Sequence, residues 1–219
     1  MRGLVVAAAL FLATAAQSAE LVDAGGPASL ERPGRRPIGS IILMPGGDGY
    51  LGIAADGSIG RLQQNQLIRT RGQYVRAGFA VLSLDASADP ARAVQFMRSI
   101  ASPVVVVATS RGVSRAPRAL GGQPDGLVLT SGMLDAFKAS VGSPGALPRT
   151  LVVHHRHDGC ATTSPSAVEP FAAWGGGRVS VVWLDGGSDS GDPCQAAGHH
   201  GFAGLDGSVV SIVSRFARR

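Results

Sequence analysis

Cysteine and charged residues are scarce in this chain of 219 residues. Two cysteines are too few for a miniprotein held together by disulfides or for a zinc module with four cysteine ligands. Charged residues make up 16% of the chain against 45% hydrophobic residues, and its 31 glycines and 13 prolines stay below the level of a disordered tract. The composition therefore excludes collagen, coiled coils and intrinsic disorder, and it predicts one globular domain with a buried core.

Lysine is almost absent, so nearly all of the positive charge comes from arginine. Lys138 is the only lysine, and the formal net charge is +5. The arginines are spread along the chain. The pairs at residues 35–36 and 218–219 are short, and no aromatic residues interleave with the arginines of either pair. A groove that follows a nucleic-acid backbone needs clustered basic residues and aromatic side chains on which bases stack. We therefore expect no nucleic-acid partner.

Long hydrophobic runs are also absent, with one short exception at the N-terminus. Arg2 precedes an apolar run from Leu4 to Ala16, which is too short to span a bilayer but suits the core of a signal peptide. Small residues follow up to Ala19, as a cleavage site requires. We predict that residues 1–19 are a signal peptide and that the protein is exported, periplasmic or secreted, without a stable membrane span. An uncleaved N-terminal anchor is the alternative.

Beyond this segment the chain alternates between apolar runs and amphipathic stretches. Residues 20–37 are rich in Gly, Pro and Arg, lack periodicity and are expected to form an N-terminal arm. Short apolar runs predict strands at residues 40–44, 79–84, 103–108, 126–130, 150–154 and 178–184. Helical spacing and helix-start signals predict helices near residues 61–77, 90–100, 111–120, 165–174 and 206–217.

This alternation predicts the α/β class: a single domain over residues 38–219, with a mostly parallel sheet covered by helices on both faces. Right-handed crossovers place the loops that follow the strands along the carboxyl edge of the sheet, where the chemistry is expected. The segment between residues 131 and 150 is too short for a cap domain. We therefore expect an open, shallow site instead of a deep acyl tunnel.

The most specific motif follows the strand with four consecutive valines. The spacing of a nucleophile elbow, G-x-S-x-G, recurs in Ala108-Thr109-Ser110-Arg111-Gly112, with alanine in the first glycine position. Small flanking residues allow a sharp turn from strand to helix on which a serine hydroxyl protrudes, and the N-terminal amides of the helix favour negative charge beside it. Ser110 is the predicted nucleophile, and a serine that only caps the helix is the structural alternative.

A serine hydroxyl needs a base to become a nucleophile, and the base needs an acid to orient it. Asp158 follows the strand at residues 150–154, and His200 lies in the last loop beside His199. Together with the serine they give the order Ser…Asp…His, which hydrolases of this architecture use. Asp158 is the predicted acid, and Asp135, after the preceding strand, is its rival.

With these residues the chain resembles a compact α/β-hydrolase over nearly its whole mature length. The tripeptide His-Gly-Phe at residues 200–202 is similar to that of dienelactone-hydrolase-like members, in which this histidine is the base. We therefore favour His200 over His199. Two features depart from the family: Ala108 in the elbow, and Pro-Gly-Gly at residues 45–47 where many esterases begin this loop with histidine.

The resemblance implies a serine esterase that cleaves an ester-type bond of a small molecule through an acyl-enzyme, with no cofactor and no metal. It also implies that the backbone N–H groups of Gly47 and Arg111 form the oxyanion hole. The Arg111 side chain suits either an anionic substrate or a nearby carboxylate. Because fold does not determine function, a hydrolase-like scaffold that binds a ligand or partner without turnover is the alternative of another class. The sequence does not define an oligomeric state.

Two other patterns indicate different chemistry. Residues 47–52 match G-x-G-x-x-G after the first predicted strand, and Asp85 ends the second, as in dinucleotide-binding folds. However, no helix is expected directly after that loop, and Asp85 comes later than the acidic residue of such folds. The five histidines lie at residues 154–157 and 199–200 and suggest zinc, but neighbours on a strand point to opposite faces and do not all converge. Both patterns rank below the hydrolase interpretation.

The two cysteines flank the candidate acid and base. Cys160 closely follows Asp158, and Cys194 lies shortly before His200. In an oxidising compartment the two thiols are expected to pair, which would tie the acid loop to the base loop and hold the geometry of Asp158 and His200. Two buried free cysteines are the alternative.

Overall fold

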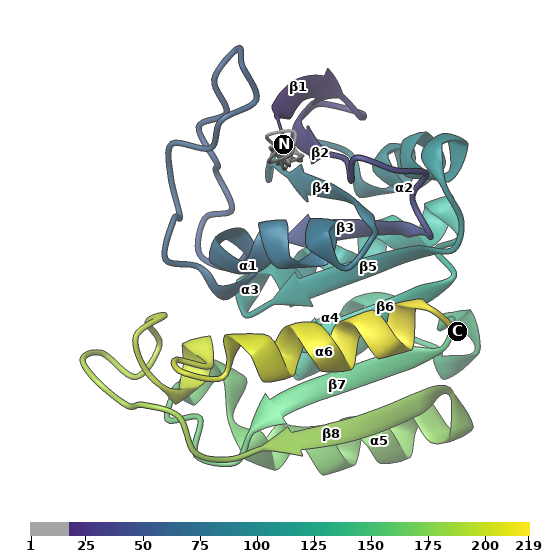
Figure 1. Cartoon of the computed structure of the whole chain (residues 1–219). Coiled ribbons are helices and arrows are strands. Elements are labelled where there is room, and N and C mark those ends of the chain that lie inside the picture. Colours follow the sequence, from purple (N-terminus) through teal and green to yellow (C-terminus); the bar gives the residue numbers. More distant parts are fainter. Residues whose placement is uncertain (1–17) are drawn as a thin grey trace, which may run out of the picture.

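Residues 18–219 are described by the computed structural model, and they form one eight-stranded sheet with helices on both faces (Figure 1). The predicted signal peptide lies outside the described residues except for its last two positions. The strands are β1 (Ala19–Asp23), β2 (Pro27–Glu31), β3 (Ser40–Met44), β4 (Ala80–Leu84), β5 (Val104–Thr109), β6 (Gly126–Thr130), β7 (Thr150–His155) and β8 (Val179–Leu184). Strands β3 to β8 correspond to the six strands predicted from the sequence.

The strand order across the sheet is β1-β2-β4-β3-β5-β6-β7-β8. Strands β3 to β8 are parallel, whereas β1 and β2 pair antiparallel and extend the sheet at the β4 side. The predicted α/β class with a mostly parallel sheet is therefore confirmed. Because the six parallel strands run in one direction, their carboxyl ends lie at one edge of the sheet, at the left in Figure 1.

Six α-helices are formed within residues 18–219. They are α1 (Gln66–Arg76), α2 (Pro90–Ile100), α3 (Arg111–Arg115), α4 (Leu134–Val141), α5 (Val168–Gly175) and α6 (Asp206–Ala217). Helices α1 and α6 pack on one face, and α2, α4 and α5 pack on the other (Figure 1). No cap domain is inserted between the strands within residues 18–219, and no helix in this range is long and apolar enough to cross a bilayer.

The valine run of β5 shows how the sequence places this strand at the centre. Val104 and Val106 pack into the core on the side of α2, while Val105 and Val107 pack into the core on the side of α1 and α6. Alternate side chains of a strand point to opposite faces, so a continuous apolar run is buried on both sides. This burial fixes the position of the strand end that carries Ser110.

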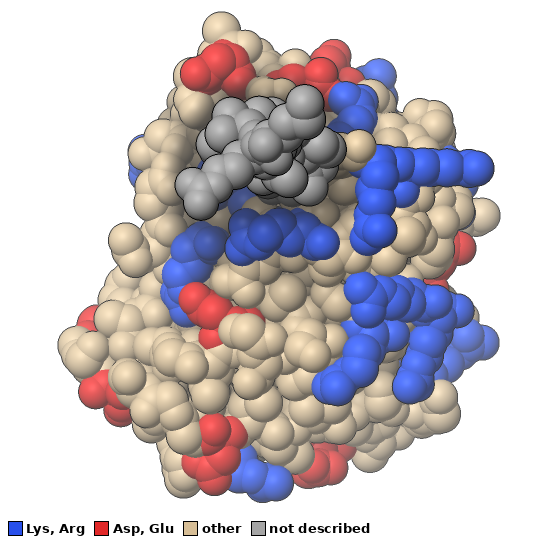
Figure 2. Space-filling model, viewed as in Figure 1, with Lys and Arg blue, Asp and Glu red and all other residues tan. Residues whose placement is uncertain are grey.

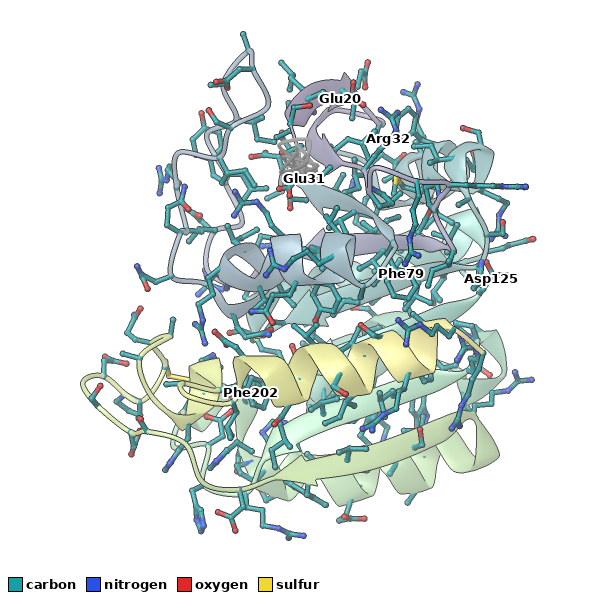
Figure 3. The ribbon with its side chains drawn as sticks, in the orientation of Figure 1. Glu20, Glu31, Arg32, Phe79, Asp125 and Phe202 are labelled. Carbon is teal, nitrogen blue, oxygen red and sulfur yellow. A yellow bond between two sulfur atoms is a disulfide. The ribbon has the colours of Figure 1, made fainter. Side chains whose placement is uncertain are left out.

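The N-terminal arm differs from its expected form, because residues 20–37 contain a hairpin instead of an irregular segment. The turn between β1 and β2 is closed by Asp23, whose Oδ1 accepts hydrogen bonds from the N–H groups of Gly25 and Gly26 at 3.0 and 2.7 Å. Both glycines have positive φ angles, a conformation that glycine adopts without strain. Glu20 and Arg32, labelled in Figure 3, form an ion pair across the base of the hairpin.

The loop after β3, which contains the G-x-G-x-x-G match, does not have the structure of a dinucleotide-binding loop. No helix follows it directly: residues 53 and 59 form an isolated β-bridge, and α1 begins only at Gln66, later than predicted. Asp85 is buried at the end of β4, and its Oδ2 accepts a hydrogen bond from the N–H of Leu51 at 2.8 Å. The carboxylate therefore fastens the loop to the sheet instead of facing a ribose.

Candidate active site

Ser110 stands on a sharp turn between β5 and α3. Its φ and ψ angles are 52° and −126°, a region that side-chain-bearing residues rarely occupy. The turn requires a glycine at position 112, because a Cβ there would overlap the carbonyl oxygen of Met44. Ala108, in the first glycine position of the motif, is fully buried and is accommodated. The predicted elbow is thus present, and its strained conformation goes beyond what a helix-capping serine needs.

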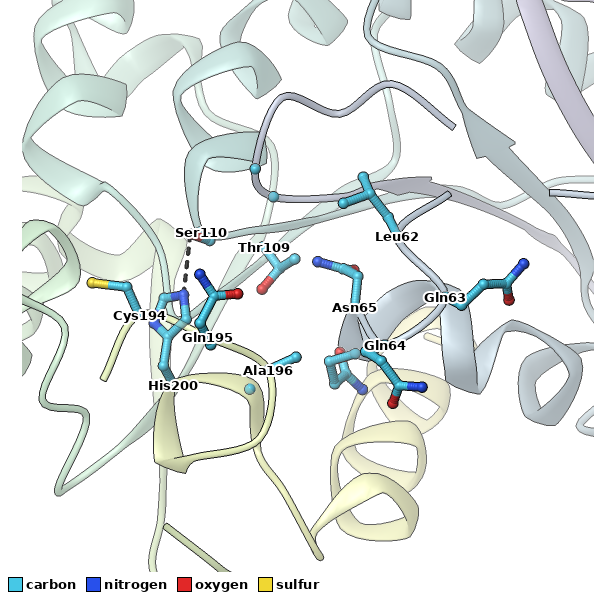
Figure 4. Close-up of a pocket in the computed structure, with 14 residues that line it drawn as sticks. Leu62, Gln63, Gln64, Asn65, Thr109, Ser110, Cys194, Gln195, Ala196 and His200 are labelled. Carbon is cyan, nitrogen blue, oxygen red and sulfur yellow. Dashed lines mark hydrogen bonds between the residues drawn. The ribbon is translucent and has the colours of Figure 1, made fainter. Parts of the chain in front are cut away.

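His200 is the histidine that contacts Ser110. Its Nε2 lies 3.1 Å from Ser110 Oγ, drawn as a dashed line in Figure 4. Its Nδ1 lies 3.2 and 3.1 Å from the two carboxylate oxygens of Asp158, which can only accept hydrogen bonds. Nδ1 therefore carries the proton, and Nε2 accepts from the serine hydroxyl. The three candidate residues from separate parts of the chain meet in one hydrogen-bonded line.

The Asp158 carboxylate is buried and surrounded by donors. The N–H of Cys160 donates to Oδ1 at 3.0 Å, and the Thr163 hydroxyl donates to Oδ2 at 3.1 Å. His154 Nε2 lies 3.3 Å from the same Oδ2. Burial raises the pKa of Asp158, but the hydrogen bonds from His154 and His200 and the charge of His200 outweigh it and hold the pKa well below its usual range. The carboxylate therefore stays ionised beside His200.

The histidine that is hydrogen-bonded to Ser110 is His200, whereas His199 contacts His155 and His157. Its ring stacks on His155 with centroids 4.1 Å apart, and its Nδ1 lies 3.2 Å from the carbonyl oxygen of His157. Nε2 of His155 in turn donates to the carbonyl of Gly186 at 2.9 Å. The histidines thus fall into separate groups, and no set of three or more His, Cys, Asp or Glu side chains in the described chain is arranged to hold a metal ion.

Asp135, the rival acid, is exposed in the first turn of α4. The carboxylate in contact with His200 is that of Asp158. The helix α4 itself was not predicted, because only Leu134 and Phe137 of its eight residues are buried and they give too little periodicity.

Gly47 and Arg111, whose N–H groups the resemblance gives as oxyanion donors, both belong to the surroundings of Ser110. Gly47 lines the same cavity as Ser110 and His200, and Gly46 approaches so closely that a Cβ on it would lie 2.8 Å from Ser110 Cβ. Arg111 is the first residue of α3, so its N–H has no partner within the helix. The Arg111 side chain is exposed.

A disulfide joins Cys160 to Cys194, as expected. Cys160 belongs to the turn that holds Asp158, and Cys194 belongs to the loop that leads to His200. The bond thus fastens the loop after β7 to the long loop after β8, whose residues 185–195 are largely exposed. This loop has few other anchors before His200.

Three further residues also hold the site: Thr163 and Arg69, which the sequence analysis did not single out, and His154, which it considered only as a possible zinc ligand. His154 and Thr163 contact the Asp158 carboxylate. Arg69 of α1 donates to both carboxylate oxygens of Asp206 at 2.9 and 2.7 Å and to the carbonyl of Gly201 at 2.7 Å. Arg69 thereby connects α1, α6 and the turn that carries His200. Among these three residues, only His154 had a sequence signal for a place near the site, namely its position at the end of a predicted strand.

The cavity beside the serine has a volume of about 380 Å³ and opens at the carboxyl edge of the sheet (Figure 4). Its walls come from four segments: residues 46–47 after β3, residues 62–66 around the start of α1, residues 109–110 at the serine turn, and the last loop with residues 194–196 and 200–201. On the face of the molecule drawn in Figure 2, Lys and Arg side chains form several groups separated by uncharged surface.

The sheet order and the sharp serine turn after β5 are those of the α/β-hydrolase fold. No family model matches the chain, and no curated protein matches it. Solved structures do match, at low sequence identity, and they share the fold with this chain.

One of these structures is an α/β serine hydrolase without a lid from Xanthomonas campestris, 16% identical, with 97% of this chain and 99% of that chain covered at a TM-score of 0.61. A dienelactone hydrolase from Anabaena variabilis is also 16% identical, and the match covers 91% of this chain and 95% of that chain at a TM-score of 0.61. Carboxyl esterase 2 from Tuber melanosporum is 13% identical, and the match covers 96% of this chain and 88% of that chain at a TM-score of 0.60.

Proposed function

We propose that this protein is an exported serine hydrolase that cleaves an ester or related acyl bond through an acyl-enzyme. The observation that carries the proposal is the hydrogen-bonded line from Ser110 Oγ to His200 and Asp158 on a strained elbow that opens into a cavity. The solved structures of the same fold, which include serine hydrolases and esterases by their descriptions, support the same class.

In the first half-reaction, Ser110 Oγ attacks the carbonyl carbon while His200 Nε2 takes the hydroxyl proton. Asp158 keeps the imidazole in the tautomer that accepts this proton and stabilises the imidazolium that forms. The N–H groups of Gly47 and Arg111 stabilise the negative oxygen of the tetrahedral intermediate. The carbon–oxygen bond to the alcohol then breaks, and His200 returns its proton to the leaving oxygen.

In the second half-reaction, a water molecule takes the place of the alcohol. His200 Nε2 removes a proton from the water as its oxygen attacks the acyl carbon, and the resulting intermediate collapses to release the acid. The proton returns to Ser110 Oγ, and the free enzyme is restored. This cycle uses side chains and backbone amides of the chain alone.

Labelling with a fluorophosphonate probe tests the proposal, because such a probe reacts only with an activated serine. We expect labelling of the wild type, none of Ser110→Ala, and labelling slowed by several orders of magnitude for His200→Ala. The matched controls Ser114→Ala, in the same helix, and His199→Ala should label at the wild-type rate. A well-folded wild type that stays unlabelled would contradict the hydrolase and favour a scaffold that binds without turnover.

Export is tested separately from chemistry. We expect the full chain, expressed in a bacterium with an intact secretion system, to yield a periplasmic or secreted form that lacks residues 1–19 and begins at or near Glu20. Intact-mass measurement gives the start site. Recovery of only the full-length chain from the cytoplasm would contradict export.

A further inference from the structure

The residues that line the cavity beside Ser110 include no Asp, Glu, Lys or Arg, and His200 is the one histidine among them. Carboxamides supply much of the cavity wall: Gln63, Gln64, Asn65, Gln66 and Gln195. A carboxamide donates and accepts hydrogen bonds, as an alcohol hydroxyl does. An aliphatic ligand would displace water from these amides without offering them hydrogen-bond partners, and this loss makes the free energy of binding less favourable.

Three of the five amides are directed elsewhere. Gln63 donates through Nε2 to the carbonyl of Ile59. Nε2 of Gln66 lies 3.4 Å from Thr70 Oγ1, within α1. In Figure 4 the side chain of Gln64 points away from the serine. Two amides are left to contact a ligand, one on each side of the cavity.

Asn65 is the first of these. It caps α1, and its Oδ1 accepts a hydrogen bond from the N–H of Leu67 at 3.1 Å. Because the cap occupies the oxygen, the amide nitrogen Nδ2 is the group that is turned toward the cavity, on the side of Thr109 (Figure 4). The cap therefore presents a donor in a fixed orientation.

Gln195 is the second, and its amide lies beside the Ser110–His200 pair in Figure 4. The preceding residue, Cys194, is bonded to Cys160, and the N–H of Gln195 closes a local turn by donating to the carbonyl of Asp192 at 2.9 Å. The two amides thus line the same cavity as Ser110, Asn65 from the N-terminal cap of α1 and Gln195 from the residue next to the disulfide.

We propose that the substrate of this site is an ester whose alcohol part is an uncharged polyol, such as an O-acylated sugar, with its hydroxyls bound by Asn65 and Gln195. This inference rests on the proposed serine hydrolase function and specifies its substrate class. Leu62 gives the wall an apolar patch for the carbon skeleton. The guanidinium of Arg111 belongs to an exposed residue that is not among those lining the cavity, so the wall offers no cation for an anionic ester.

Two acetates with the same acyl group and ring size test the proposal: methyl 6-O-acetylglucopyranoside and cyclohexylmethyl acetate. Both are esters of primary alcohols, and only the first carries hydroxyls on the ring. We expect the mature protein to hydrolyse the glycoside with a kcat/KM at least about tenfold higher, after correction for alkaline reactivity, because the hydroxyls pair with amides that the hydrocarbon leaves unpaired.

Two variants test whether Asn65 and Gln195 are the residues that bind the hydroxyls of the glycoside. Asn65→Ser keeps a capping oxygen but removes Nδ2, and Gln195→Met keeps the length of the side chain but removes the amide. Each should lower kcat/KM for the glycoside about tenfold and leave cyclohexylmethyl acetate within about twofold. Gln73→Met, on the same helix but outside the cavity, is the matched control and should leave both substrates unchanged.

The possible failures are distinguishable. Absence of fluorophosphonate labelling would remove the hydrolase function itself, and this inference with it. Normal labelling together with equal hydrolysis of the two acetates, or with equal losses on both in the variants, would overturn the polyol assignment alone. Faster hydrolysis of an acetate with a carboxylate in its alcohol part, lost in Arg111→Gln, would also overturn it and assign recognition to that arginine.

Discussion

At the scale of single residues, the donors around Asp158, two histidines among them, hold its carboxylate in the ionised form. His154 Nε2 lies between two acceptors, the carbonyl of Thr163 at 2.9 Å and Asp158 Oδ2 at 3.3 Å, so this nitrogen carries the proton. Nδ1 of His154 is buried and has no hydrogen-bond partner in residues 18–219. The Asp158 carboxylate thus receives hydrogen bonds from both histidines in addition to those from Cys160 and Thr163.

This arrangement predicts a specific loss of stability in acid. The pKa of Asp158 is lower in the folded than in the unfolded chain, so the unfolded state binds more protons as the pH falls through about 3.9. The free energy of unfolding should therefore fall below pH 4 more steeply for the wild type than for Asp158→Asn, by up to about 1.4 kcal/mol per pH unit. Urea denaturation from pH 6 to pH 2.5 measures both slopes.

Asp135→Asn is the matched control, because it removes an exposed carboxylate that does not contact His200. Its profile should run parallel to that of the wild type. Parallel profiles for Asp158→Asn and wild type would mean that the Asp158 carboxylate is not stabilised in its ionised form.

At the scale of elements, the Cys160–Cys194 bond replaces secondary structure as the anchor of the loop after β8. The bond spans 34 residues, and in the chain-entropy model a ring of this size stabilises the folded state by roughly 3–4 kcal/mol. We expect Cys160→Ala/Cys194→Ser to lose about this much unfolding free energy. We also expect slower fluorophosphonate labelling, because the acid and base loops are no longer joined.

Reduction of the wild type offers an independent check. Treated with a thiol reductant, it should match the double variant in both measurements, and the double variant itself should not respond to the reductant. If labelling stays at the wild-type rate in both cases, the bond stabilises the fold without holding Asp158 and His200 together.

The elements show which parts of the structure the sequence can predict. The strands β3 to β7 were predictable because each is buried and therefore reads as a mostly apolar run, and β8, which is only partly buried, still carries such a run. β1 has a mostly exposed pattern and β2 contains Pro27 and Ser29, so both lack that signal. The elbow serine and the His-Gly-Phe turn were recognisable from local motifs. The roles of Thr163 and Arg69 depend on contacts across the fold, which no local pattern encodes.

At the scale of the whole molecule, the N-terminal hairpin protects one edge of the sheet. β2 pairs with β4, and its Ala28 and Leu30 are fully buried in the core next to α2. Glu31 also forms an ion pair with Arg71 of α1 at 2.6 Å. The hairpin is thus an integral part of the domain. Without β2, the β4 backbone would become an open edge that pairs readily with other chains.

This unequal burial predicts that the two strands of the hairpin contribute differently to stability. A chain that begins at Gly25 lacks β1, whose residues are mostly exposed, and should lose little unfolding free energy relative to a chain that begins at Glu20. A chain that begins at Arg32 also lacks Ala28 and Leu30, and it should lose at least about 3 kcal/mol and associate at micromolar concentration. Urea denaturation and size-exclusion chromatography of the three chains measure both effects. Equal unfolding free energies of the chains that begin at Glu20 and Arg32 would mean that β1 and β2 do not contribute to the stability of the domain.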